Sequence, residues 1–344
     1  MDMPERNEQK KLRRILQGLD EGWLKYEPKK KAKIDFKVYT EAQIAEIENV
    51  LVLIREIINE AACYVPYDAR PGKQPKDFGA KAKAILLQQY FQCSNRVAAG
   101  LVRLFRKNLG IYEELSYKDI ERAYGNTEVQ LILGKAFEIC NRPLRDKEKD
   151  FSVDGTGLTT SIKENYARDK DDKKAKKTWE KAIVMIGNVY KLFSSARLVG
   201  GKSNECPHLV PLLDETMRIY EELGVVAGDA AYLSKDNCNA IVSYGGTPRI
   251  YPKSNTVINR RGSKAWKDML LAFVADPQKW LEEYHIRSNV EGGNSVLKRL
   301  FARPLLKKLD TRKKFEGFAR LCIYNVRRLN YIHALHKDVK VGWL

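Results

Sequence analysis

The sequence contains neither a long hydrophobic run nor a cysteine pair spaced to bind a metal. No run of about 18 apolar residues occurs, so we expect no membrane-spanning helix. The first residues, MDMPERNEQKKLRRIL, lack the apolar core of a secretory signal. The 6 cysteines are scattered without a C-x-x-C motif, which disfavours a structural zinc site. These absences favour a cytoplasmic protein with reduced thiols.

Acidic residues are too few to balance the basic ones. The chain has 62 Lys and Arg residues against 44 Asp and Glu residues, which gives a formal net charge of +18. Such an excess favours binding to a polyanion, of which nucleic acid is the commonest. A ribosomal role and a membrane-surface role are the alternatives. The hydrophobic content of 44% is typical of a folded globular protein.

The first part of the chain is predicted to be helical after a charged beginning. Residues 1–38 are rich in charge, including the lysine run in EPKKKAK, and we expect them to form a basic flexible arm. A short helix at LRRILQGL is the alternative for part of this segment. Residues 39–148 carry apolar residues at helical spacing, which predicts an all-helical region. This region is expected to bind DNA or to mediate assembly.

One helix of this region is a candidate for DNA contact. Residues 94–107 are predicted to be helical, with an inner face formed by Val97, Leu101, Leu104 and Phe105. Arg96 and Arg103 lie on the outer face and are candidate DNA-binding residues. Helix pairs are common in any small helical domain, so an ordinary packing role is the alternative.

From residue 149 the pattern changes to short apolar runs separated by turn residues. The order is three strands, a helix, a strand, a helix, a strand and further helices up to residue 335. Three consecutive strands predict an antiparallel meander, and the later alternation predicts parallel crossovers. The fold class is therefore α/β, with a mixed sheet flanked by helices. We expect the charged run 164–179 to be a solvated loop, with DNA contact as the alternative.

Three carboxylates have positions that suit catalysis. Asp154 follows the apolar run of the first, short strand in SVDGTG, and Asp229 follows a later strand in LGVVAG. Functional groups gather at strand ends in an open α/β sheet, so the two can meet if their strands are neighbours. Glu291 lies on a later helix that can reach the same edge. Divalent cations relieve the repulsion among such acids, although each aspartate alone is also an ordinary turn residue.

The stretch EYHIRSNVEGGNSVLKRLF, residues 283–301, predicts one helix with a mixed polar face. At about 100° per residue, four side chains share a stripe about 60° wide: Tyr284, Arg287, Glu291 and Lys298. A carboxylate among cations suits a site that binds phosphates and a metal. It also suits a solvated helix face, because an arginine and a glutamate at i,i+4 spacing form an ordinary ion pair.

Taken together, these motifs resemble the insertion-sequence DDE transposases with a ribonuclease-H-like catalytic domain. VDGTGL is similar to their first-aspartate motif, GDAAYLSKDN is similar to the second, and YHIRSNVEGGNSVLK fits the signature Y-x2-R-x3-E-x6-K at every spacing. The resemblance covers roughly residues 150–330. In two respects the sequence departs from the pattern: Ala230-Ala231 replaces a frequent Lys-Gly pair, and the 62-residue gap to Glu291 is too short for a large β-rich insertion.

The resemblance implies a catalytic domain at 149–335 and a metal-dependent reaction. Asp154, Asp229 and Glu291 would be the catalytic acids and would bind two Mg²⁺ ions, for which Mn²⁺ can substitute. The implied activity is DNA cleavage at the transposon ends followed by joining to target DNA. A ribonuclease-H-like DNA nuclease without strand transfer is one alternative. A transposase-derived DNA-binding protein without catalysis is the other.

The resemblance also implies partners. Tyr284, Arg287 and Lys298 would position the DNA of the transposon end. The partners would be double-stranded DNA, namely the terminal inverted repeats and the target, and a second copy of the chain in the DNA complex. Such a protein would act in a prokaryotic cytoplasm at the nucleoid, with no membrane partner.

Overall fold

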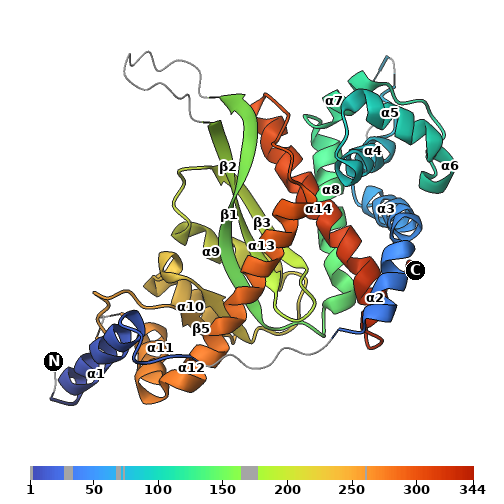
Figure 1. Cartoon of the computed structure of the whole chain (residues 1–344). Coiled ribbons are helices and arrows are strands. Elements are labelled where there is room, and N and C mark those ends of the chain that lie inside the picture. Colours follow the sequence, from blue (N-terminus) through green and yellow to red (C-terminus); the bar gives the residue numbers. More distant parts are fainter. Residues whose placement is uncertain (1–2, 27–33, 67–70, 73, 164–176, 260–261) are drawn as a thin grey trace, which may run out of the picture.

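A mixed sheet lies at the centre of the molecule (Figure 1). The computed structural model describes residues 3–26, 34–66, 71–72, 74–163, 177–259 and 262–344. In these residues five strands form one sheet: β1 (Phe151–Lys163), β2 (Lys177–Gly187), β3 (Phe193–Gly200), β4 (Val225–Gly228) and β5 (Thr247–Ile250).

The strand order confirms the predicted topology. The order across the sheet is β3-β2-β1-β4-β5. The first three strands form an antiparallel meander, and β4 and β5 run parallel to β1. This is the ribonuclease-H-like arrangement. Strand β1 is longer than expected, because it pairs with β2 well beyond Asp154 and continues to Lys163.

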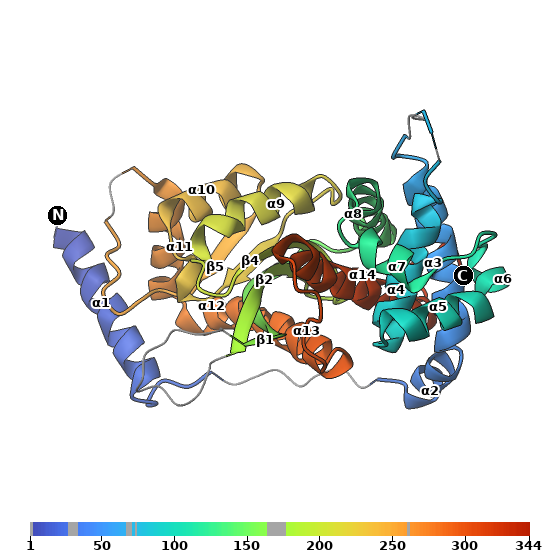
Figure 2. The same cartoon turned by 90° about the horizontal axis from the view of Figure 1, so that it is seen from above.

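Helices cover both faces of the sheet (Figure 2). On one side lie α9 (Leu209–Met217) and α10 (Lys235–Ser243), and on the other lie α12 (Pro277–Tyr284) and α13 (Ser288–Leu300). Helix α11 (Lys264–Ala275) packs on α10 and α12. Residues 182–186 of β2 are fully buried, as expected for a strand covered on both faces.

Helix α13 approaches the sheet unusually closely at Gly293. A Cβ atom at this position would lie 2.5 Å from Cδ1 of Ile186 on β2. The glycine therefore leaves room for the side chain of Ile186 against the helix backbone. The next residue, Asn294, is brought down to the sheet by this contact and is itself buried.

The N-terminal region is helical, as predicted. Its helices are α2 (Phe36–Ile44), α3 (Glu46–Ala62), α4 (Phe78–Phe91), α5 (Asn95–Leu104), α6 (Arg106–Leu109), α7 (Tyr117–Ala123) and α8 (Thr127–Asn141). Short 3-10 helices follow along the chain: η1 (Arg142–Leu144), η2 (Cys206–His208), η3 (Ala230–Tyr232) and η4 (His285–Arg287). Several helices begin after an Asp, Ser or Asn whose side chain caps the first turn.

One long helix connects the helical region to the sheet. Helix α14 (Asp310–Leu335) packs against α2, α3, α4 and α8 and also against β3 (Figure 1). The buried apolar residues of both regions form one continuous cluster. The two regions therefore share a core, and α14 contributes to both sides of it.

The segment expected to be a flexible arm begins instead with a docked helix, α1 (Met3–Asp20). Leu12 and Leu16 are buried, and α1 packs on α11. Gln9 donates to the carbonyl oxygen of Thr256 at 2.9 Å and accepts from the amide of Ile258 at 2.8 Å. The lysine run at 27–33 and residues 164–176 of the charged run lie outside the described residues.

The predicted helix at 94–107 differs in its end and in its buried face. Phe105 leaves the helical conformation at φ −95° and ψ 14°, so α5 ends at Leu104 and a separate short helix follows. Ala98 and Val102 are buried, whereas Val97 and Leu104 are 54% and 70% exposed. The predicted inner face was therefore half right. Leu101 and Phe105 pack against the core, but Val97 and Leu104 do not, and Ala98 and Val102 are buried instead.

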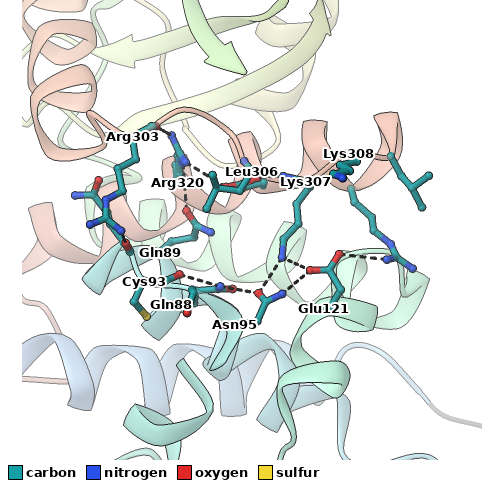
Figure 3. Close-up of a pocket in the computed structure, with 15 residues that line it drawn as sticks. Gln88, Gln89, Cys93, Asn95, Glu121, Arg303, Leu306, Lys307, Lys308 and Arg320 are labelled. Carbon is teal, nitrogen blue, oxygen red and sulfur yellow. Dashed lines mark hydrogen bonds and ion pairs between the residues drawn. The ribbon is translucent and has the colours of Figure 1, made fainter. Parts of the chain in front are cut away.

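A polar network joins the helical region to the connection between α13 and α14 (Figure 3). The carboxylate of Glu121 on α7 accepts hydrogen bonds from Lys307 at 2.5 Å and from Asn95 at 2.6 Å. Burial alone would raise the pKa of Glu121, but these hydrogen bonds lower it. Arg312 adds a longer ion pair at 3.3 Å. Nearby, Arg320 pairs with Glu316 at 3.1 Å.

No helix in the part of the chain described here combines the length and the apolar character needed to cross a membrane.

Candidate active site at the sheet edge

The two aspartates are brought together by parallel strand pairing. The last paired residues of β1 and β4 are Val153 and Gly228. Asp154 and Asp229 are the next residues on these two strands, which lie about 4.8 Å apart. Asp229 also starts η3, and its carboxylate accepts from the amide of Ala231 at 2.8 Å. The strands that carry the two aspartates are thus neighbours, which was the condition for the aspartates to meet.

Asp154 has an environment that disfavours its charge. Burial raises its pKa to about 6, and the nearby charge of Asp229 acts in the same direction. Arg287 and a hydrogen bond from Asn294 partly oppose this rise. A carboxyl group with such a pKa gains from a nearby cation, because the cation stabilises its ionised form.

Asn294 is a site residue that the sequence reasoning missed. It is 5% exposed, and its Nδ2 atom donates to Oδ2 of Asp154 at 3.1 Å. Its Oδ1 atom is buried and has no hydrogen-bond partner in the described structure. It lies three residues after Glu291 and four before Lys298, so helical spacing alone could have identified it.

The stretch at 283–301 is not a single continuous α-helix. Helix α12 ends at Tyr284, the 3-10 turn η4 follows, and α13 begins at Ser288. The turn η4 packs against both β1 and β4. This contact places Arg287 beside the strands that carry the aspartates. The prediction of one helix was therefore wrong, although the expected ion pair between Arg287 and Glu291 is present.

Arg287 lies among the three predicted acids. Its guanidinium contacts the carboxylate of Glu291 at 2.5 Å. Burial alone would lower the pKa of Arg287, but Tyr284, Glu291 and the two aspartates together raise it. Glu291 itself is 53% exposed at its side chain. Arg287 thus supplies the positive charge that balances this acidic site.

Tyr284 is buried rather than presented on the surface. It is 8% exposed and packs against Trp280 and Tyr251 with ring centroids 5.5 Å and 5.2 Å away. The guanidinium of Arg287 lies 5.9 Å from its ring centroid. Tyr284 was predicted to share one stripe with Arg287, Glu291 and Lys298. The structure keeps it beside Arg287 but buries it in this aromatic cluster, whereas Lys298 is exposed.

A cleft of about 700 Å³ opens beside these residues. Its lining includes Asp154, Glu291, Asn294, Lys298 and Arg299. Lys298 is exposed at the surface of α13. The cleft therefore combines carboxylate oxygens with cations, as a site for a phosphodiester requires.

The donor set fits a hard divalent cation in part. The two aspartates and the unpartnered Oδ1 atom of Asn294 offer oxygen atoms, which Mg²⁺ prefers. Within the described residues, however, no group of three or more His, Cys, Asp or Glu side chains is close enough to hold a metal. The third acid, Glu291, is held by Arg287 instead.

The cations of the helical region lie on a separate surface. Arg96 and Arg103 are both exposed on α5. The guanidinium of Arg96 lies 5.2 Å from the ring centroid of Tyr117. Arg103 lines a groove of about 350 Å³ together with Lys76 and Arg106. Neither arginine lines the carboxylate cleft.

Fold and site together define a ribonuclease-H-like α/β protein with acids at the ends of adjacent strands. The family model described as Transposase DDE domain matches residues 145–326, which is more than half of the chain. The chain therefore belongs to the DDE transposase family.

Among the known proteins similar to this chain are an insertion-sequence transposase and two transposase structures. A probable transposase for insertion sequence element ISA1214 from Archaeoglobus fulgidus is 24% identical over 313 residues, covering 90% of this chain and 92% of that protein. Structures of the Mos1 transposase paired-end complex with left transposon end and of a pre-cleavage Mos1 transpososome are 10% and 11% identical. Each match covers 67% of this chain and 82% of that chain, with a TM-score of 0.22.

Proposed function

We propose that the chain cuts DNA at transposon ends and joins the freed ends to target DNA. The observation that carries this proposal is the pair Asp154 and Asp229 on adjacent parallel strands, inside the segment that matches the DDE family. The neighbouring cleft offers both acids and cations, which phosphodiester chemistry needs. A nuclease without strand transfer and a non-catalytic DNA-binding protein are the competing functions.

Asp154, Asp229 and Glu291 would hold two divalent ions, Mg²⁺ or in its place Mn²⁺. When bound, such ions activate a water or a 3′-hydroxyl and stabilise the leaving oxygen. The raised pKa of Asp154 and the unpartnered oxygen of Asn294 support this assignment. Asn294 would orient the carboxylate of Asp154 through its hydrogen bond.

Arg287 would couple DNA binding to assembly of the site. The carboxylate of Glu291 is paired with the guanidinium of Arg287, and it would turn toward the aspartates once this pair opens. A DNA phosphate offers this guanidinium a strong alternative partner, because arginine binds phosphate oxygens in a bidentate manner. Binding of DNA would therefore free the third acid. Tyr284, whose ring centroid lies 5.9 Å from this guanidinium, would position the DNA through Arg287.

Other cations would hold the DNA along the protein. Lys298 lies at the surface of the cleft and would bind a backbone phosphate close to the reacting bond. Arg96 and Arg103 would extend the contact over α5 to the flanking duplex. Because two transposon ends have to be paired before they are inserted together, a homodimer is proposed for the DNA complex.

A strand-transfer assay tests the proposal. The purified chain is mixed with the flanking ends of its own element, a supercoiled target plasmid and Mg²⁺. We expect joined products from the native chain and a loss of roughly 1,000-fold or more with Glu291→Gln, about 4 kcal/mol of transition-state stabilisation. Glu222→Gln, at an exposed position outside the cleft, is the matched control and should retain activity.

The products separate the competing functions. Nicked DNA without joined products would identify a nuclease, and binding without either product would identify a DNA-binding protein. Full activity in Glu291→Gln would show that the assignment of the third acid is wrong.

A further inference from the structure

A second cavity lies across α13 from the carboxylate cleft. It has a volume of about 480 Å³ and is bounded by residues of α2, α13 and α14. We call it the tyrosine–arginine pocket after six of its lining residues: Tyr39, Tyr324, Tyr331, Arg299, Arg327 and Arg328. No aspartate or glutamate is among the described residues that line it.

The tyrosine rings on the aromatic side of the pocket are fixed by stacking and by hydrogen bonding to a buried carboxylate. Tyr39 on α2 stacks on Tyr331 on α14, with ring centroids 5.1 Å apart and planes inclined by 24°. The hydroxyl of Tyr331 donates to the buried carboxylate of Glu46 at 2.5 Å. Arg327 pairs with the same carboxylate at 2.7 Å. The ring of Tyr331 is therefore fixed before any ligand arrives, which lowers the entropy lost on binding.

The cationic side contains one anchored and one unpaired guanidinium. Arg328 donates from its Nε atom to the carbonyl oxygen of Tyr190 at 2.8 Å. Arg299 is exposed, and in the described part of the chain its side chain has no hydrogen bond or ion pair. A pocket with cations, stacked tyrosines and no acid suits a ligand that is both anionic and aromatic.

The pocket adjoins the carboxylate cleft. Ser295 and Arg299 of α13 line both cavities. Gly292 and Ser288 also line the pocket, and their small size leaves space beside the helix there. A polynucleotide strand with one phosphate in the cleft can therefore cross α13 at Arg299 and place its next unit in the pocket.

The geometry points to a binding site for one unpaired nucleotide of the DNA strand that lies in the carboxylate cleft. Its base stacks against Tyr39, and its phosphate is bound by Arg299 and Arg328. The volume falls within the range of roughly 300–1,000 Å³ that holds small ligands, which admits a single nucleotide but not a duplex. This inference rests on the proposed function, because it requires DNA in the cleft.

Binding to single-stranded and double-stranded probes tests the pocket without requiring cleavage. The full chain is titrated in EDTA with a fluorescent oligothymidylate containing one 2-aminopurine, and separately with a fully paired duplex. The variants are Tyr39→Ala, with Tyr39→Phe as a control that keeps the ring. A second pair, Gln43→Glu and Gln43→Lys, introduces opposite charges at an exposed position lining the pocket.

We expect Tyr39→Ala to weaken single-strand binding by roughly 5- to 100-fold, the effect of losing one stacked base. It should also abolish the quenching of 2-aminopurine, while duplex binding and the Tyr39→Phe variant remain unchanged. Gln43→Glu should weaken single-strand binding and Gln43→Lys should strengthen it. If the Tyr39→Ala substitution weakened binding of both probes equally, or of neither, the inference about the pocket would be wrong and the proposed function would stand. Failure of the native chain to bind either probe would overturn the proposed function as well.

Discussion

The sheet edge and the helical region hold their functional side chains in opposite ways. At the sheet edge, Asp154 is partly buried, fixed by strand pairing and hydrogen-bonded by Asn294. In the helical region, Arg96 and Arg103 are exposed on one helix. The first arrangement fixes atoms for chemistry at a cost in solvation, and the second provides charge with freedom to follow a flexible polyanion.

This difference predicts two kinds of mutational effect. Changes at the sheet edge should alter reaction rate and the stability of the fold, with little change in DNA affinity. Changes on α5 should alter affinity and its salt dependence, with little change in rate. The polar network around Glu121 lies between the two regions. We expect it to couple their unfolding.

Glu121→Ala should have the largest effect on stability. It tests whether the sheet and the helical region depend on each other for their stability. The substitution leaves the buried Lys307 without its carboxylate partner. Its ammonium keeps only neutral contacts among the described residues, namely Asn95 and the ring of Tyr124. We expect a loss of about 2–4 kcal/mol in the free energy of unfolding. Urea unfolding followed by far-UV circular dichroism measures it.

Glu114→Ala is the control, because Glu114 is an exposed glutamate and no ion pair of its side chain is found in the described chain. Two separate unfolding transitions in the native chain would contradict the shared core. An unchanged free energy in Glu121→Ala would show that the network contributes nothing.

The double substitution Arg96→Ala and Arg103→Ala tests the role of α5 in DNA affinity. If each arginine contacts one phosphate, duplex affinity should fall about tenfold and the slope of log K against log salt should decrease by about 2. Cleavage by the saturated complex should proceed at the native rate. Fluorescence anisotropy over a salt series measures the slope.

Removing Lys264 and Lys279, two exposed lysines on α11 and α12, changes net charge equally and is the control for nonspecific attraction. An identical loss in that variant would mean that α5 has no special role.

Asp154→Asn should have the smallest effect, an increase in stability. The folded pKa of about 6 lies above the unfolded value of about 3.9, so the ionised carboxylate destabilises the fold at neutral pH. We expect a gain of about 1–2 kcal/mol at pH 7 in EDTA, after allowance for partial solvent exposure. The gain should shrink as pH falls through about 6 and vanish below about 4, where the group is protonated in both states.

Unfolding in urea at several pH values gives this profile. Asp236→Asn, at an exposed position, should show no such pH dependence. A loss of stability in Asp154→Asn at pH 7 would contradict the electrostatic account.

Much of the fold was predictable because its signals are local. The order of strands and helices after residue 149 follows from runs of apolar residues and turn residues, and the pairing of β1 with β4 brought Asp154 and Asp229 together as expected. The roles of the predicted site residues remain proposals, although their positions are now known.

What sequence reasoning missed depends on contacts between distant segments. The helical pattern LRRILQGL is visible at the start of the chain, but its partners near Thr256 are not. The turn at η4 carries no glycine or proline and results from packing against β1 and β4. The tyrosine–arginine pocket combines three helices, so no single motif could show it.

The position of α14 has a consequence for biosynthesis. This helix packs against α3, α4 and α8, which are made long before it. During synthesis, the apolar surfaces of those helices stay exposed until residues 310–335 have left the ribosome. Nascent chains and truncated products that lack α14 should therefore be bound by chaperones or degraded, and only complete chains should accumulate in folded form.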